Sequence, residues 1–263
     1  MDFLLFRKVI AFILLTSCGE LNYSPYVFDI RERKLNEINL SKIITRSTKF
    51  SNKYKVAVIA DSHNYFKDLN KQVHYINRNY KDIAFVIHLG DVTNFGLLLE
   101  WEMFLAVMDK LRVPFLLVIG NHDMLLNGIE IYKKMFGNNL NFSFSFKQTK
   151  YILYNNNNWE SDELAPDFYF LQNELELSKD TSNILFGHVQ ADDPDRYTKN
   201  QRDEMRYLVN AYEVDYILNG HNHNYGHGFL GNSIRLTAGS SSKKKLLLLS
   251  ISDEGNSYDF VSP

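Results

Sequence analysis

The chain has 263 residues, of which 45% are hydrophobic and 14% aromatic, and its formal net charge is −2. This apolar content is enough for one sizeable core. The near-neutral charge and the scattered lysines do not provide the basic surface that duplex nucleic acid requires, so we expect no sequence-specific nucleic-acid partner. The single cysteine, Cys18, excludes an intrachain disulfide.

The N-terminus has the layout of a secretory signal. Arg7 and Lys8 precede the apolar run 9–15, which is too short to cross a bilayer as a helix. Leu-Thr-Ser-Cys at 15–18 resembles the bacterial lipobox, in which the chain is cut before a cysteine that receives a lipid. We therefore predict a lipoprotein signal peptide at residues 1–17 and a lipid anchor on Cys18 that attaches the protein to a membrane of the bacterial cell envelope. The alternative is a buried N-terminal strand or helix with an ordinary cysteine.

Residues 18–53 show no clean helical or strand period, because polar and charged residues interrupt the apolar ones. We expect a lipid-anchored tether that passes into an irregular segment packed on the domain. From residue 54 to 263, short apolar runs alternate with amphipathic segments, which is the pattern of an α/β domain.

The predicted elements of this domain include both helices and strands. Two helices are indicated by apolar stripes at helical spacing, the first through Leu69, Val73, Ile76 and Tyr80 and the second through Leu97, Trp101, Phe104, Met108 and Leu111. Strict alternation over 142–147 predicts a half-buried antiparallel strand, with further strands at 151–154, 233–236 and 246–251. We therefore expect parallel and antiparallel pairing in the same protein.

The most informative regularity is the way in which the buried strands end. Five apolar runs each lead into a polar group: Val56–Ala60 into Asp61-Ser62-His63, Ile83–Leu89 into Gly90-Asp91, Phe115–Ile119 into Gly120-Asn121-His122-Asp123, Ile184–Phe186 into Gly187-His188, and Tyr216–Leu218 into Asn219-Gly220-His221-Asn222-His223. Ligands of open α/β sheets bind beyond the carboxyl ends of the strands, so these endings can converge on one site.

These endings offer carboxylates, a carboxamide and imidazoles, but no thiolate. Such donors suit divalent ions such as Mn, Fe or Zn, and their number fits two ions. A carboxylate can bridge two ions about 3.5–4 Å apart, and such a pair generates a shared hydroxide for in-line attack on phosphorus. We therefore expect two divalent metal ions as cofactors.

The motifs Asp-x-His, Gly-Asp, Gly-Asn-His-Asp, Gly-His and Gly-His-x-His resemble, in order and spacing, those of calcineurin-like metallophosphoesterases, over residues 54 to about 251. The resemblance implies an α/β fold of four layers, an α/β/β/α sandwich with two mixed sheets. It also implies that Asp61, His63 and His223 hold the first metal, that Asp91 bridges, and that Asn121, His188 and His221 hold the second.

The resemblance further assigns two catalytic residues. It implies that His122 contacts the phosphate and protonates or stabilises the leaving oxygen, and that Asp123 orients the His122 ring through a hydrogen bond. The remaining histidines, His74, His88 and His227, are expected to lie outside the metal cluster. His88 is close enough to Gly90 in the sequence to contact residues that surround the metal ligands.

Two polar segments are more ambiguous. Asp192, Asp193 and Asp195 lack the rest of a calcium-loop pattern and are interpreted as a solvated lip. The asparagine run 155–158 leaves a strand as the ligand segments do, so it either meets the leaving group or forms a plain loop, which is the preferred interpretation.

The sequence predicts a hydrolase of phosphate esters, and the preferred interpretation is that its substrate is a phosphodiester. Phe95 stands where protein serine/threonine phosphatases carry an arginine, and Val189-Gln190-Ala191 replaces the familiar His-x-Pro pattern, which leaves the substrate open. One alternative is a nucleotide phosphatase or pyrophosphatase of the same fold. The other is a surface lipoprotein that uses the domain for binding alone.

Overall fold

The computed structural model describes residues 30–79, 81–179 and 181–263. The predicted signal peptide, Cys18 and the first part of the predicted tether lie outside these residues. Over the described ranges, no helix combines the length and the apolar character that a membrane span requires.

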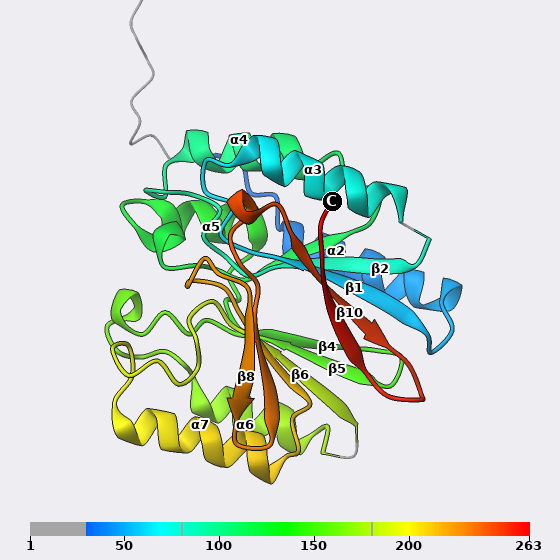
Figure 1. Ribbon diagram of the computed structural model, residues 1–263. Coiled ribbons are helices and arrows are strands. Elements are labelled where there is room, and N and C mark those ends of the chain that lie inside the picture. The colour runs from blue at the N-terminus through cyan, green and yellow to red at the C-terminus, as the bar shows by residue number, and fades with distance from the viewer. Residues whose placement is uncertain (1–29, 80, 180) are drawn as a thin grey trace, which may run out of the picture.

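Two mixed β-sheets form the centre of the protein (Figure 1). The five-stranded sheet has the order β11-β10-β1-β2-β3, and the six-stranded sheet has the order β4-β5-β6-β7-β9-β8. The strands are β1 (Tyr54–Ile59), β2 (Ile83–His88), β3 (Phe115–Leu117), β4 (Phe142–Phe146), β5 (Thr149–Leu153), β6 (Ser182–Phe186), β7 (Tyr216–Asn219), β8 (Gly226–Leu230), β9 (Ser233–Thr237), β10 (Leu246–Ile251) and β11 (Ser257–Val261).

The strands that carry the polar endings run parallel to one another within each sheet. β1 pairs with β2 and β2 with β3 in parallel, and β5, β6, β7 and β9 do the same in the other sheet. The antiparallel strands are added at the margins: β10 and β11 in the first sheet, β4 and β8 in the second. Parallel alignment therefore places the predicted ligand segments at one edge of each sheet.

Helices cover the outer faces of both sheets (Figure 1). They are α3 (Phe66–Arg78), α4 (Leu98–Met108), α5 (Gly128–Phe136), α6 (Phe168–Glu176) and α7 (Lys199–Ala211), whereas α2 (Leu35–Arg46) lies along the edge strand β3. Side chains of α3, α4 and α5 share an apolar core with the first sheet, and those of α6 and α7 share one with the second. A third core joins the sheets, so the predicted four-layer α/β/β/α fold is confirmed.

Helix α2 corrects the expectation of an irregular segment for residues 35–46. Its buried residues are Asn36, Asn39 and Ile43, so the inward face is mainly polar and gives no apolar period. Asn36 Nδ2 donates to the Leu117 carbonyl (3.0 Å), the Leu117 amide donates back to Asn36 Oδ1 (2.9 Å), and Asn39 Nδ2 donates to the Phe115 carbonyl (2.9 Å). Since β3 is an edge strand, these amides satisfy backbone groups that a neighbouring strand would otherwise satisfy.

We predict that Asn36→Ala lowers the free energy of unfolding by about 1–3 kcal/mol, because it leaves the buried amide of Leu117 without its acceptor. Urea denaturation followed by circular dichroism measures the change. Ser41→Ala, on the exposed side of the same helix, is the matched control and is expected to have little effect. Equal midpoints for the wild type and Asn36→Ala would contradict the proposed role of this asparagine.

Candidate metal centre

The structure brings all seven predicted metal ligands together. They lie on segments that follow five strands: Asp61 and His63 after β1, Asp91 after β2, Asn121 after β3, His188 after β6, and His221 and His223 after β7. Both sheets therefore contribute, and the site lies where the carboxyl ends of their parallel strands meet.

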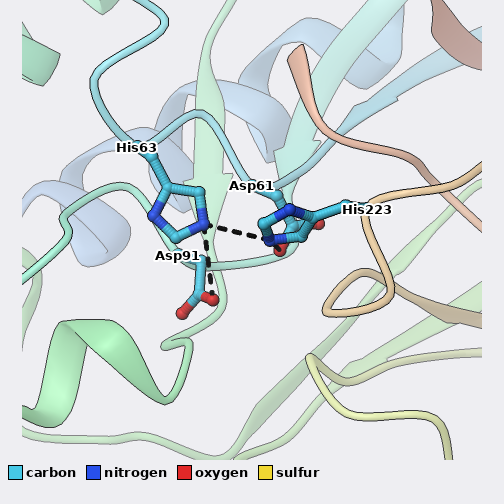
Figure 2. Close-up of side chains that lie close together, drawn as sticks. All are labelled: Asp61, His63, Asp91 and His223. Carbon is cyan, nitrogen blue, oxygen red and sulfur yellow. Dashed lines mark hydrogen bonds and ion pairs between the residues drawn. The ribbon is translucent and has the colours of Figure 1, made fainter. Parts of the chain in front are cut away.

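Four of these side chains form what we call half-site 1: Asp61, His63, Asp91 and His223. One ligand atom from each lies within 4.8 Å of the others. His63 Nε2 is 3.2 Å from His223 Nε2 and 3.7 Å from Asp91 Oδ2, and His223 Nε2 is 3.7 Å from Asp61 Oδ1. Figure 2 shows the two rings and the two carboxylates directed toward one another.

Half-site 2 consists of Asp91, Asn121, His188 and His221. Ligand atoms of Asp91, His188 and His221 lie within 4.8 Å of one another. Asn121 Oδ1 completes the group at 3.0 Å from His188 Nε2 and 2.9 Å from His221 Nδ1. Asp91 Oδ2 is 3.2 Å from His188 Nε2, so the same carboxylate oxygen serves both half-sites.

Charge and burial at this cluster fit divalent cations. Asp61 and Asp91 are 0% and 1% exposed, and among the described residues only histidines form ion pairs with them. Burial, together with the charge of Asp91, raises the pKa of Asp61 well above its ordinary value. Burying carboxylates without a permanent cation is costly, and metal ions remove that cost. Oxygen and imidazole donors without thiolate suit hard or borderline ions.

Backbone carbonyls orient two of the imidazoles. His63 Nδ1 donates to the Thr93 carbonyl (3.0 Å), and His188 Nδ1 donates to the Leu89 carbonyl (2.7 Å). A carbonyl oxygen can only accept, so the proton of each neutral ring is on Nδ1 and the Nε2 lone pair is directed at the cluster. Burial lowers the pKa of His188, but the nearby Asp91 carboxylate outweighs this effect and raises the pKa to about 9. The negative charge of Asp91 therefore favours a positive charge at the position next to it.

The backbone of the ligand segments is strained. Five of the predicted ligands have positive φ angles, in a region that non-glycine residues seldom occupy: Asp61 (47°), His63 (39°), Asp91 (54°), His221 (65°) and His223 (57°). Glycine lets two of these segments approach closely, because a Cβ at Gly120 would lie 2.1 Å from the Asp91 nitrogen. Strain of this kind persists only where surrounding contacts fix it, which is typical of functional sites.

His122 lies at the rim of half-site 1. Its amide donates to Asp91 Oδ1 (2.9 Å), and its ring Nδ1 donates to the Asn94 carbonyl (2.8 Å). The ring lines a pocket of about 320 Å³, and the other residues around this pocket are His63, Asn64, Tyr65, Asn94 and His223. Because Nδ1 is engaged, Nε2 is the ring nitrogen available to a bound molecule.

Asp123 does not orient the His122 ring, so that part of the prediction is wrong. Its carboxylate accepts from the amides of Val92, Thr93 and Gly120, each at 3.0 Å, and from the Thr93 hydroxyl at 2.9 Å. Burial, followed by the charge of Asp91, raises the pKa of Asp123 to about 7. Asp123 therefore holds the backbone next to Asp91 and Asn121. The Asn94 carbonyl, rather than Asp123, orients the His122 ring.

His88 connects two ligand segments without joining the cluster. The Gly90 amide donates to His88 Nδ1 (3.2 Å), so Nε2 carries the proton and donates to the Ser62 hydroxyl (3.1 Å). Burial lowers the pKa of His88 to about 3 and keeps the ring neutral. His74 contacts the Asn70 carbonyl and His227 contacts the Tyr258 hydroxyl, so these two histidines also lie outside both half-sites.

The acidic segment after His188 is not entirely solvated as predicted, because Asp192 forms an ion pair. Arg235 Nη1 lies 2.6 Å from both carboxylate oxygens of Asp192, and Gln190 Nε2 donates to the same carboxylate (3.0 Å). Asn222, between two metal ligands, donates to Gln190 Oε1 (2.9 Å). This chain of contacts joins the segment that follows His188 to the His221–His223 segment.

Comparison with known proteins shows one family match, one curated relative and two similar solved structures. The model of the calcineurin-like phosphoesterase family matches residues 54–225. A probable cyclic nucleotide phosphodiesterase of Xenorhabdus bovienii is 28% identical over 127 residues, which cover 46% of this chain and 44% of that relative, so the match spans less than half of either protein.

Among solved structures, a dimetal phosphatase of Danio rerio has a TM-score of 0.63 at 14% identity, covering 80% of this chain and 97% of its own. GAP50, the anchor in the inner membrane complex of Plasmodium, has a TM-score of 0.61 at 16% identity, covering 80% and 84%. At these identities the similarity shows the fold.

We predict that Asp91→Asn weakens the binding of both metal ions, because one neutral amide replaces the carboxylate that both half-sites share. The loss of affinity should exceed the roughly 10–100-fold that removal of an outer partner of a ligand costs. Calorimetric titration with Mn²⁺ measures it, and Asp68→Asn, a surface carboxylate paired with Lys71, is the control. Wild-type affinity for two ions in Asp91→Asn would exclude a bridging role.

Proposed function

Because the chain belongs to the calcineurin-like phosphoesterase family, we propose that it is a metal-dependent hydrolase of phosphate esters with a preference for phosphodiesters. The observation that carries the proposal is the Asp91 carboxylate, whose Oδ2 lies 3.7 Å from His63 Nε2 in half-site 1 and 3.2 Å from His188 Nε2 in half-site 2. A shared carboxylate is the arrangement that holds two divalent ions close together.

Bound divalent ions supply an activated water for in-line attack on phosphorus and compensate the charge of the phosphate. The residues of this chain position the ions and the substrate and supply a proton to the leaving oxygen. The predicted ligands of half-sites 1 and 2 would hold the ions, and the ring of His122 lines the pocket that His63 and His223 also line. Since its Nδ1 donates to the Asn94 carbonyl, protonated His122 can donate from Nε2 to the leaving oxygen.

The pocket beside His122 supports a substrate that is larger than a bare phosphate. Its volume of about 320 Å³ extends between Asn64, Tyr65 and Asn94, and Tyr65 is 45% exposed. An exposed aromatic ring offers a stacking face for a base or another flat group, and the two amides offer polar contacts. These features favour an ester with a second organic substituent, such as the cyclic nucleotide named for the Xenorhabdus bovienii relative.

Two other functions fit the same fold. A nucleotide phosphatase or pyrophosphatase would use the same ions and His122 on a terminal phosphate. The alternative from a different class of function is a protein that binds a partner without catalysis. The similarity to an anchor protein of Plasmodium is a reason to test this alternative. The oriented His122 ring favours catalysis, because binding alone does not require a proton donor at the rim of a metal centre.

We predict that the purified, Mn²⁺-loaded protein hydrolyses bis(para-nitrophenyl) phosphate faster than para-nitrophenyl phosphate, and that it opens cyclic AMP. His122→Gln should lower kcat by about 10²–10⁴-fold while Mn²⁺ binding is unchanged, because it removes proton transfer but no metal ligand. Asp91→Asn is the metal-deficient control. Faster monoester cleavage would favour the phosphatase, and no turnover on a broad panel despite two bound ions would favour the binding protein.

We also propose that the protein is anchored to a bacterial membrane through a lipid on Cys18, on the strength of the charged start, the short apolar run and the Leu-Thr-Ser-Cys segment. Expression in a bacterial host with labelled palmitate should give a labelled protein in the membrane fraction. Cys18→Ser should abolish the label and shift the protein to the soluble fraction. Membrane partition and palmitate incorporation by Cys18→Ser would refute the proposal.

A further inference from the structure

The asparagine run 155–158 follows β5 and is buried. All four side chains are less than 10% exposed, and Asn157 is fully covered. Four consecutive buried carboxamides are costly unless each finds hydrogen-bond partners, because amides lose their contacts with water on burial. The partners of two of them lie on segments that carry ligands of half-site 2.

Asn156 holds the His188 segment through three hydrogen bonds. Its Oδ1 accepts from the amides of His188 (2.8 Å) and Val189 (3.0 Å), and its Nδ2 donates to the Val189 carbonyl (2.6 Å). The contact requires glycine at position 187, where a Cβ would lie 2.6 Å from Asn156 Nδ2. Tyr197 fixes Asn156 from the other side, since its hydroxyl donates to the Asn156 carbonyl (2.5 Å).

Asn157 reaches the other ligand segment of the same half-site. Its Nδ2 donates to the Ile119 carbonyl (2.9 Å), two residues before Asn121, and also to Asn155 Oδ1 (2.9 Å). The Asn157 amide donates to the same Asn155 oxygen (3.0 Å), which fixes the turn. The run therefore lies between the segments of His188 and Asn121, whose side chains are 3.0 Å apart.

We infer that Asn156, supported by Asn157, is a positioning residue for half-site 2. Neither residue touches a metal ligand atom. Apart from the contact of Asn157 with Asn155, the described hydrogen bonds of their side chains go to backbone groups of the His188 and Ile119 segments and to none of the segments that carry Asp61, His63 or His223. Loss of the Asn156 contacts therefore releases His188 while half-site 1 keeps its ligands.

This inference rests on the proposed metal centre and is independent of the choice of substrate. The test is metal binding by the full-length protein, measured by calorimetric titration with Mn²⁺ and by electron paramagnetic resonance, which distinguishes an exchange-coupled Mn²⁺ pair from an isolated ion. Asn156→Ala is expected to weaken one binding step by about 10–100-fold, to leave the other step unchanged, and to replace the coupled signal with an isolated one at limiting Mn²⁺.

Asn158→Ala is the matched control. It removes an equally buried asparagine from the same run, but the Nδ2 of Asn158 donates to the Ala165 carbonyl (2.6 Å), away from the ligand segments. Asn156→Asp tests the mechanism further, because a carboxylate keeps the acceptor for the amides of His188 and Val189 and loses only the donor to the Val189 carbonyl. We expect wild-type binding from Asn158→Ala and an intermediate loss from Asn156→Asp.

Three results would overturn the inference: equal weakening of both binding steps in Asn156→Ala, the same loss in Asn158→Ala, or a coupled Mn²⁺ pair of wild-type affinity in Asn156→Ala. If Asn156→Ala does not fold, Asn156→Asp decides, and unchanged affinity in it would then count against the inference. Failure of the wild type to bind two ions is a separate outcome, which removes the proposed metal centre and this inference together.

Discussion

The buried carboxylate of Asp91 is the interaction on which the site depends. One of its oxygens faces His63 from the first sheet and His188 from the second, and the other accepts the amide of His122. Burial by itself would raise the pKa of Asp91, but the charge and hydrogen bond of His188 outweigh burial and hold the pKa far below its ordinary value. Both sheets must therefore keep their strand ends in register around a single charged group.

Apolar packing brings the sheets together, and hydrogen bonds from buried polar side chains then fix the ligand segments. The core between the sheets contains Phe85, Phe146 and Phe186. Their burial removes apolar surface from water, but this effect is not directional and does not fix the position of a ligand side chain. The segments beyond the strand ends have left the sheet ladders, so their amides and carbonyls need other partners. Asp123 supplies them beside Asp91, and Asn156 supplies them beside His188. Asp91 itself has a positive φ angle, and the contacts of Asp123 with the amides of Val92 and Thr93 fix the residues that follow it.

The sequence was sufficient for the fold class and for the convergence of the site, because both depend on patterns along the chain. Apolar runs ending in Asp, Asn and His identify the strand ends, and parallel strands bring such ends together. Side-chain to backbone hydrogen bonds leave no such pattern. Helix α2 was missed because its inward face carries Asn36 and Asn39, and the partner of the His122 ring was missed because it is a backbone carbonyl. Asn156 stands in a run of identical residues, so only the structure shows which of them meets His188.

In the function that we propose, metal binding and substrate selection depend on different residues. The ligands are constrained by shared atoms and strained backbone, so few substitutions are compatible with the cluster. Asn64, Tyr65 and Asn94 line the pocket beside His122 without contributing a ligand atom, and Tyr65 is partly exposed. Under the proposed function, substitutions at these positions would alter the ester that fits and leave the metal ligands in place. The fold by itself does not determine the function, since proteins that share it at 14–16% identity include a dimetal phosphatase and a membrane-complex anchor.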